Sequence, residues 1–237
     1  MLPATGHEKL VNQLVLPLRL ADHAVFASFL STGNESLIAL LSDLADGAGG
    51  PGCWLWGPTA TGKTHLLQAA CDRVGDRSVY VPLAQFVAAS PALLDGLASR
   101  DLVCIDDLSH VAGDAAWESA LFGLYNQILD ANGHLVVADA MSPRECPIVL
   151  ADLKSRLSRL PCFHVQPLAE ADRVAALQLR AGHRGLDLPD ETASYLISRS
   201  RRDMASLYEL LDRLDLEALR AQRRLTIPFV RSVLLGK

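Results

Sequence analysis

The sequence has 237 residues, half of them hydrophobic and 21% charged, a composition typical of a soluble, well-packed protein. This length suffices for one α/β domain with a small helical domain attached. The net charge of −5 argues against a surface that binds DNA broadly, because such surfaces carry a basic excess. We find neither the pattern of a signal peptide nor an apolar run long enough to span a bilayer. We therefore expect a cytoplasmic protein that contacts no membrane.

Five cysteines are scattered along the chain without a C-x-x-C pair. They are Cys53, Cys71, Cys104, Cys146 and Cys162. Three of them lie in apolar runs, which is typical of free thiols that serve as small core residues in a reducing compartment. The cysteines therefore predict no disulfide framework.

The first 20 residues are predicted to form an extended arm. Pro17 disfavours helical geometry at Leu16, so residues 13–18 cannot form the interior of a helix. In an extended segment alternate side chains share a face, and Leu14, Leu16 and Leu18 therefore point the same way. Two interpretations remain: the arm packs on its own domain, or it docks into an apolar pocket of a partner.

Short apolar runs alternate with helical patterns between residues 34 and 165. Five runs are predicted to be buried strands, at residues 53–56, 78–82, 102–105, 134–138 and 162–165. Helical spacing is found at residues 34–44, 63–74, 83–97, 115–131 and 150–160. This alternation predicts an α/β core at residues 21–167, with a five-stranded parallel sheet covered by helices on both faces.

The pattern changes after Pro167, because only helical spacing follows it. The predicted helices cover residues 170–183, 190–200, 203–222 and 226–235. Pro189 and Pro228 lie near two of the predicted helix starts, where proline is tolerated. We therefore expect residues 168–237 to form a small all-helical lid on the α/β core.

A phosphate-binding motif follows the first predicted strand and opens a predicted helix. It reads Gly, four free positions, then Gly-Lys-Thr, and its residues are Gly57, Pro58, Thr59, Ala60, Thr61, Gly62, Lys63 and Thr64. The glycines let the backbone fold around an anion, and the amides of the loop and of the helix start face the phosphates. Lys63 is predicted to reach the β- and γ-phosphates, and the Thr64 hydroxyl to ligate Mg²⁺. The motif predicts a P-loop nucleotide-binding protein.

Two carboxylates follow the apolar run at residues 102–105. Ligands of open parallel sheets bind beyond the carboxyl ends of the strands. We therefore expect Asp106 to lie near the Mg²⁺ ion, directly or through a water, and Asp107 to polarise an attacking water. His65 lies just inside the helix after the loop, and we interpret it as a packing or surface residue rather than a base.

The motifs resemble those of the DnaA-related AAA+ family of P-loop NTPases, and within it those of the Hda regulators. Residues 62–67 (GKTHLL) with 105–108 (IDDL) carry the DnaA-like pattern, and residues 177–181 and 225–230 resemble Hda lid segments. The resemblance implies an AAA+ core with a helical lid, an adenine nucleotide (ADP or ATP) with Mg²⁺, and a role in restraining replication initiation. It also implies two partners, DnaA and the sliding clamp of DNA polymerase III, with DNA reached only through the clamp.

The arm fits this resemblance. Gln13, Leu14, Leu16, Pro17 and Leu18 match the clamp-binding motif at the start of Hda proteins. Proline stiffens the segment and lowers the entropy cost of docking. The resemblance therefore favours clamp binding by the arm over packing on its own domain.

Several site residues follow from the resemblance alone. Asp139 matches the sensor 1 acid, and Arg156 matches the arginine finger that acts in trans on a neighbour's nucleotide. His65 falls in the family's set of nucleotide contacts. Three residues fall where the family lines its base pocket: Phe26, Phe29 and Asn34. The sequence departs from the family at Ala205, where the sensor 2 arginine is expected, and Arg201 or Arg202 is a candidate replacement one turn upstream.

Three functions remain open. The first is a nucleotide-bound regulator that stimulates hydrolysis of DnaA-bound ATP, with weak or no ATPase activity of its own and with a homodimer as an open alternative. The second is a stand-alone AAA+ ATPase that loads or remodels a replication protein. The third is an initiator-type DNA binder, which the acidic composition disfavours.

Overall fold

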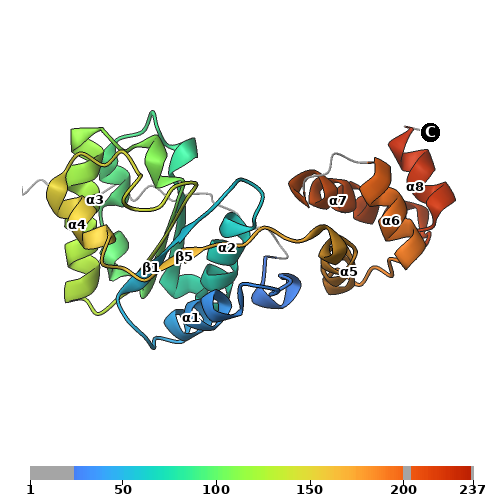
Figure 1. Cartoon of the computed structure of the whole chain (residues 1–237), viewed down its shortest axis with the longest axis horizontal. Coiled ribbons are helices and arrows are strands. Elements are labelled where there is room, and N and C mark those ends of the chain that lie inside the picture. The colour runs from blue at the N-terminus through green and yellow to red at the C-terminus, as the bar shows by residue number, and fades with distance from the viewer. Residues whose placement is uncertain (1–23, 200–203, 236–237) are drawn as a thin grey trace, which may run out of the picture.

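The computed structural model describes residues 24–199 and 204–235, and its α/β part is built on one sheet of parallel strands (Figure 1). The strands are β1 (Gly52–Trp56), β2 (Ser78–Pro82), β3 (Leu102–Asp106), β4 (His134–Asp139) and β5 (Cys162–His164). Their order is β2-β3-β4-β1-β5 and every neighbouring pair is parallel, which confirms the predicted five-stranded sheet. This order brings the carboxyl ends of β1, β3 and β4 to one edge.

Helices cover both faces of the sheet (Figure 1). On one face α1 (Glu35–Ala45) and α2 (Lys63–Val74) pack in a hydrophobic cluster with inward residues of the strands. On the other face α3 (Ala115–Asp130) and α4 (Ala151–Leu157) pack in a second cluster. The strands are apolar on both sides because both sides are covered.

The segment between β2 and β3 forms only short 3₁₀ helices instead of a continuous helix. They are Leu83–Gln85, Pro91–Leu94 and Leu97–Ser99. Pro91 starts the second piece after Ser90, whose side chain accepts a hydrogen bond from the Ala92 amide. Gly96 then adopts a positive φ and begins the third. The predicted helical turns at residues 83–97 are thus present, but proline and glycine divide them.

The C-terminal part is helical, as predicted. After a 3₁₀ turn at Glu170–Asp172 the helices are α5 (Arg173–His183), α6 (Asp190–Arg199), α7 (Met204–Ala221) and α8 (Ile227–Leu234). These helices share a third hydrophobic cluster, against which Leu30 and Leu168 also pack. We call residues 168–235 the lid. Among the described residues no helix is long and apolar enough to cross a membrane.

All five cysteines are free thiols, as the sequence predicts. Four are buried, and only Cys162, on the edge strand β5, is exposed. Burial raises the pKa of the Cys53 thiol to about 12. Because a thiol must be deprotonated to react, Cys53 serves as an inert core residue.

Candidate nucleotide-binding site

The phosphate loop, residues 57–64, joins β1 to α2. Gly57 and Gly62 both have positive φ angles, 149° and 93°, a region that favours glycine. A Cβ added at Gly62 would lie 2.5 Å from Cε2 of Phe29. Helix α2 begins at Lys63, so the free amides of its first turn face the loop and form an anion site.

The Lys63 side chain folds back over this loop. It is 8% exposed, and its Nζ donates hydrogen bonds to the carbonyl oxygens of Gly57 at 2.7 Å and Pro58 at 2.8 Å. Burial lowers the pKa of Lys63, and nearby carboxylates act in the opposite direction. These carboxylates belong to Asp106, Asp107 and Asp139. Lys63 is therefore held by the loop itself, at the end of the sheet where the acidic residues gather.

Asp106 ends β3 next to the phosphate loop, as predicted. Its Oδ2 accepts hydrogen bonds from the Thr64 hydroxyl at 2.7 Å and from the Tyr80 hydroxyl at 2.9 Å. Its Oδ1 is buried and has no hydrogen-bond partner among the described residues. Burial raises the pKa of this carboxyl, and the hydrogen bonds from Thr64 and Tyr80 lower it.

The pair of Asp106 and Thr64 fits Mg²⁺. An unpaired buried carboxylate oxygen is costly in an apolar setting, and a hard cation or its water would satisfy Oδ1. The Thr64 hydroxyl donates its proton to Asp106, which leaves its lone pairs for a metal. No cluster of three or more metal-ligating side chains exists among the described residues. Mg²⁺ in NTPases is held by few protein ligands together with phosphates and water, so the donor set is sufficient.

The other two acids occupy the same edge in different ways. Asp107 has a left-handed backbone with φ 57°, and its amide donates to the carbonyl oxygen of Ala138 at 2.9 Å. Asp139 is fully buried, and its two oxygens accept hydrogen bonds from the amides of Ser109 at 2.6 Å and Met141 at 3.1 Å. Asp139 thus ties together the loops after β3 and β4. Roles for these acids in polarising water and sensing nucleotide stay predictions.

A pocket of about 470 Å³, including its open mouth, lies between the core and the lid. Its lining residues are Ser28, Phe29, Leu30, Asn34, Ala60, Thr61, Gly62, His65, Gln166, Leu168, Ala176, Met204 and Tyr208. Its mostly apolar walls suit a flat, apolar group such as a nucleotide base. Asn34 accepts the Gln166 amide at 2.9 Å and donates to the Gln166 carbonyl at 3.3 Å, which fixes one wall. Phe29 and Asn34 therefore line this pocket, whereas Phe26 packs against the α1–α2 cluster.

His65 is a packing residue at the pocket wall. Burial lowers its pKa to about 4, so the imidazole is neutral. Its Nε2 lies 3.0 Å from the carbonyl oxygen of Val25, which can only accept, so Nε2 carries the hydrogen. Nδ1 then accepts a hydrogen bond from Nη1 of Arg180 on the lid, at 3.3 Å. His65 connects the core to the lid and lacks the freedom of a base.

Arg156 belongs to a helix that contributes neither to the phosphate loop nor to the pocket. It is exposed on α4, which packs on the face of the sheet opposite to α2 (Figure 1). Its guanidinium carbon is 5.6 Å from the ring centroid of Phe122 and 5.8 Å from that of Tyr125, both on α3. These cation–π contacts hold an outward-facing arginine over an aromatic pair. Arg156 is not among the residues that line the pocket.

Glu118 positions the helix that carries Arg156, a role that the sequence does not reveal. It is 2% exposed, and its carboxylate accepts hydrogen bonds from the amides of Gly113, Val149 and Leu150 at distances of 2.6–3.1 Å. Burial raises the pKa of Glu118, but the three backbone amides outweigh it and the net direction is downward. Leu150 is the N-cap of α4 and Glu118 lies on α3, so a carboxylate from one helix caps the next.

Further side chains at the candidate site have no signal in the sequence. Tyr80 reaches Asp106 from the neighbouring strand β2, and Gln166, Leu168 and Tyr208 complete the pocket from the linker and lid. In the structure Tyr80 pairs with Cys104 in a parallel register, two residues before Asp106 on β3. The pocket residues come together only when the lid packs on the core.

Several predicted positions are outside what the structure describes. The arm, with Gln13, Leu14, Leu16, Pro17 and Leu18, lies outside the described residues, and so do Arg201 and Arg202. Ala205 falls in the first turn of α7. Clamp binding and the replacement of the sensor 2 arginine therefore stay predictions.

This chain matches family models of DnaA and Hda, and its fold is similar to solved structures of DnaA. The model of the bacterial DnaA ATPase domain matches residues 20–160, and that of the Hda lid domain matches residues 170–234. Domain III of the replication initiation protein DnaA from Thermotoga maritima is similar with a TM-score of 0.74 and 18% identity, covering 92% of this chain and 98% of that one. AMPPCP-bound DnaA from Aquifex aeolicus has a TM-score of 0.67 and 21% identity over 85% and 68% of the two chains.

The fold is also similar to that of a protein outside the DnaA group. The RuvB Holliday junction branch migration motor of Thermotoga maritima has a TM-score of 0.63 and 16% identity, covering 88% of this chain and 70% of that one. The resemblance read from the phosphate loop and the acidic pair is thereby confirmed at the level of the family. With its parallel sheet, its phosphate loop and its Hda-type lid, the chain belongs to the DnaA-related AAA+ family.

Proposed function

We propose that this protein binds an adenine nucleotide with Mg²⁺ between its core and lid and acts as a regulator of replication initiation. In that role it docks on the sliding clamp and presents Arg156 to ATP held by DnaA, which stimulates hydrolysis and prevents re-initiation. The chemistry of the loop supports the first step, because Lys63, Thr64 and Asp106 provide the cation, hydroxyl and carboxylate that a nucleotide–Mg²⁺ complex needs. When bound, Mg²⁺ neutralises charge on the phosphates.

The observation that carries the regulatory step is the exposure of Arg156. An arginine that served its own nucleotide would have to reach the phosphate loop, but α4 and α2 lie on opposite faces of the sheet. The cation–π contacts with Phe122 and Tyr125 hold the guanidinium on the outer surface, where a second AAA+ module has access. An arginine supplied in trans stabilises the charge on the transferred phosphoryl group.

Docking on the clamp is assigned to the arm. We expect a variant with Gln13→Ala and Leu16→Ala to lose binding to the DNA-loaded clamp in a pull-down, because both the polar and the apolar anchors of the motif are removed. Its stimulation of DnaA-ATP hydrolysis should then fall to the level seen when the clamp is omitted. The stability of the lid and core should not change.

The matched control is Leu14→Ala with Leu18→Ala, which keeps the glutamine and the central leucine. It should retain part of the clamp binding. Full clamp binding by the first double variant would rule out this role for the arm. Stimulation that needs no clamp at all would rule out the docking step while leaving the role of Arg156 open.

A second candidate, a stand-alone ATPase, is favoured by the complete set of Lys63, Thr64, Asp106 and Asp107 around the loop. Under the regulatory proposal we expect steady-state ATP turnover by the purified protein alone to be slow. Turnover at about 1–100 s⁻¹, as in efficient phosphoryl-transfer enzymes, abolished by Lys63→Ala, would favour the ATPase instead.

A further inference from the structure

Three arginines on or at the end of the lid helix α5 have partly buried guanidinium groups. Arg173, Arg180 and Arg184 each have one buried guanidinium nitrogen without a hydrogen-bond partner among the described residues. Arg184 is paired with the Asp212 carboxylate. In the described part of the chain no carboxylate lies within ion-pair distance of Arg180, and the residue is only 9% exposed. A buried, unpaired guanidinium is costly, and Arg180 therefore needs an explanation.

The surroundings of Arg180 point to the pocket. Its guanidinium carbon stacks 4.2 Å from the ring centroid of Tyr208, and its Nη1 donates to Nδ1 of His65 at 3.3 Å. Both His65 and Tyr208 line the pocket between core and lid. A guanidinium has five N–H donors, and His65 accepts only one of them. Arg180 itself does not line the pocket but lies behind two of its walls, and its buried Nε has no hydrogen-bond partner among the described residues.

The electrostatic setting of Arg180 is unfavourable overall, because the carboxylate that attracts it, that of Asp212, is paired with Arg184 instead. His65 belongs to the first turn of α2, where the helix dipole is positive and Lys63 adds a further charge. Burial and the neighbouring charge of Arg184 lower the pKa of Arg180, and they outweigh the opposing effects of Tyr208 and of the Asp212 carboxylate. An arginine keeps its proton in spite of such shifts, so a positive charge remains buried at the positive end of a helix. A phosphate group bound at this helix end would accept hydrogen bonds from Arg180 and from the free amides at the start of α2.

We propose that Arg180 is a nucleotide-binding residue whose guanidinium contacts the phosphate chain of the adenine nucleotide from the lid side. Arg180 would thereby take the role of the sensor 2 arginine, which is expected at the position of Ala205. The proposal rests on the proposed function, because it assumes that the pocket and the phosphate loop hold one nucleotide. Tyr208 and His65 are positioning residues: the ring supports the guanidinium plane, and the neutral imidazole holds one N–H without neutralising the charge.

This assignment links the bound nucleotide to the lid. Arg180 and Tyr208 belong to two lid helices, α5 and α7, whereas His65 belongs to the helix of the phosphate loop. A phosphate that attracts Arg180 therefore draws the lid toward the core. The competing interpretation is that Arg180 only joins lid to core through His65, with no phosphate contact.

The test compares ligands with and without phosphates. The full-length protein, the Arg180→Gln variant and the Arg180→Lys variant are titrated with ADP and with adenosine in competition with a fluorescent ADP analogue. We expect Arg180→Gln to weaken ADP binding by about 10- to 100-fold, the range for a lost charged hydrogen bond, and to leave adenosine binding unchanged. Arg180→Lys should retain part of the ADP affinity, because it keeps the charge without the planar fork.

The matched control is Arg184→Gln, which removes an arginine with a side chain 6% exposed, one turn farther along the chain at the end of α5. Its ratio of ADP to adenosine affinity should equal that of the wild type. An equal loss of ADP and adenosine binding in Arg180→Gln would show that Arg180 only connects the lid to the core, and it would overturn the proposal. No loss of ADP binding would overturn it as well. If the wild type binds neither ligand, the proposed nucleotide function itself fails, which is a different result from failure at Arg180.

Discussion

Replacing Arg156 by alanine is expected to lower the stimulated rate of DnaA-ATP hydrolysis by about 10³-fold or more, the loss typical of removing an arginine finger. The reason is that a positive charge supplied from outside the hydrolysing module acts on the transition state alone. The measurement is single-turnover hydrolysis of ATP preloaded on DnaA, with DNA-loaded clamp and saturating regulator. Binding of the variant to the clamp and to ADP should be unchanged.

The structure explains why the substitution should be selective. Arg156 is exposed and lines no part of the nucleotide pocket. Its cation–π contacts with Phe122 and Tyr125 contribute about 0.5–1 kcal/mol at an exposed site. The adjacent Leu153 and Leu157, which anchor α4 in the core, are untouched. The variant should therefore fold with nearly wild-type stability.

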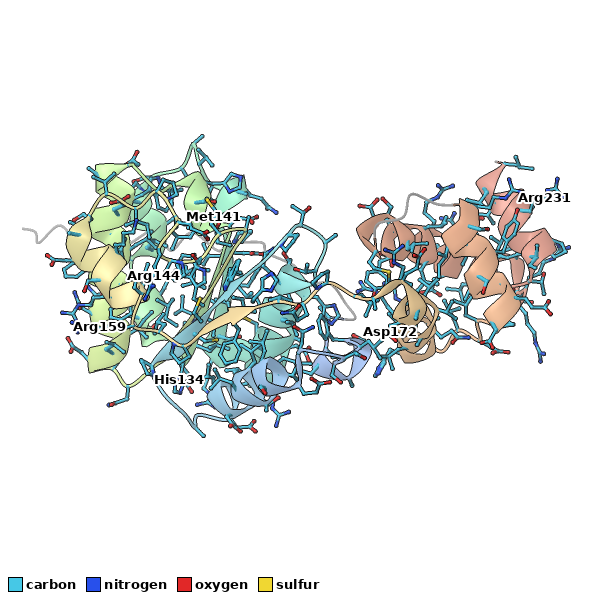
Figure 2. All side chains as sticks on the ribbon, viewed as in Figure 1. His134, Met141, Arg144, Arg159, Asp172 and Arg231 are labelled. Atoms are coloured by element: carbon cyan, nitrogen blue, oxygen red, sulfur yellow. The ribbon has the colours of Figure 1, made fainter. Side chains whose placement is uncertain are left out.

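Two controls separate the finger from general surface charge. Arg159→Ala removes an exposed arginine just beyond the end of α4 and should leave the stimulated rate within about two-fold of wild type (Figure 2). Arg156→Lys keeps the charge but not the bidentate geometry, so it should recover only part of the rate. Equal losses in Arg156→Ala and Arg159→Ala would show that net charge, and not a finger, matters.

Much of this fold was predictable because single segments carry the signal. The strands β2 and β3 are short apolar runs bounded by turn residues, and helix α2 opens with a glycine motif that has one common use. The phosphate loop and the acid at the end of β3 were found for the same reason. In each case the chemistry is carried by neighbouring residues.

The parts that were not predicted depend on contacts between distant segments. Arg180 has the pattern of an ordinary helix residue in the sequence, and only its contacts with His65 on α2 and Tyr208 on α7 show where it is buried. Glu118 likewise had the pattern of a surface glutamate on α3, although it caps α4. A buried polar residue and an exposed one look alike until the partner helix is in place.

The second large effect is expected at Gly52, the first residue of β1. Its φ is 142°, and a Cβ added there would lie 1.7 Å from the carbonyl oxygen of Leu135, its partner on β4. The oxygen that the added Cβ meets belongs to the backbone of the paired strand, so a change of side-chain rotamer cannot relieve the clash. Gly52→Ala must shift β1 away from β4 and disturb the phosphate loop that β1 leads into.

The expected size of this effect follows from two separate costs. The backbone region itself disfavours a residue with a Cβ by about 1–3 kcal/mol, and the clash adds an overpacking cost of similar size. We expect a total destabilisation of about 4 kcal/mol, which in a protein of this length lowers the thermal midpoint by about 8–16 °C. Nucleotide affinity should fall at temperatures below the new midpoint, because the loop follows β1 directly.

Gly50→Ala is the matched control, because a Cβ there meets no atom within 4 Å and its φ is not in the positive region. Its midpoint should stay within about 2 °C of wild type, as expected of an exposed substitution worth about 0.5 kcal/mol. The two glycines are two residues apart in the same glycine-rich segment before β1, so the comparison isolates the strand contact from chain entropy. Equal midpoints for Gly50→Ala and Gly52→Ala would show that β1 tolerates a side chain at its first residue, and that the close pairing with Leu135 does not limit stability.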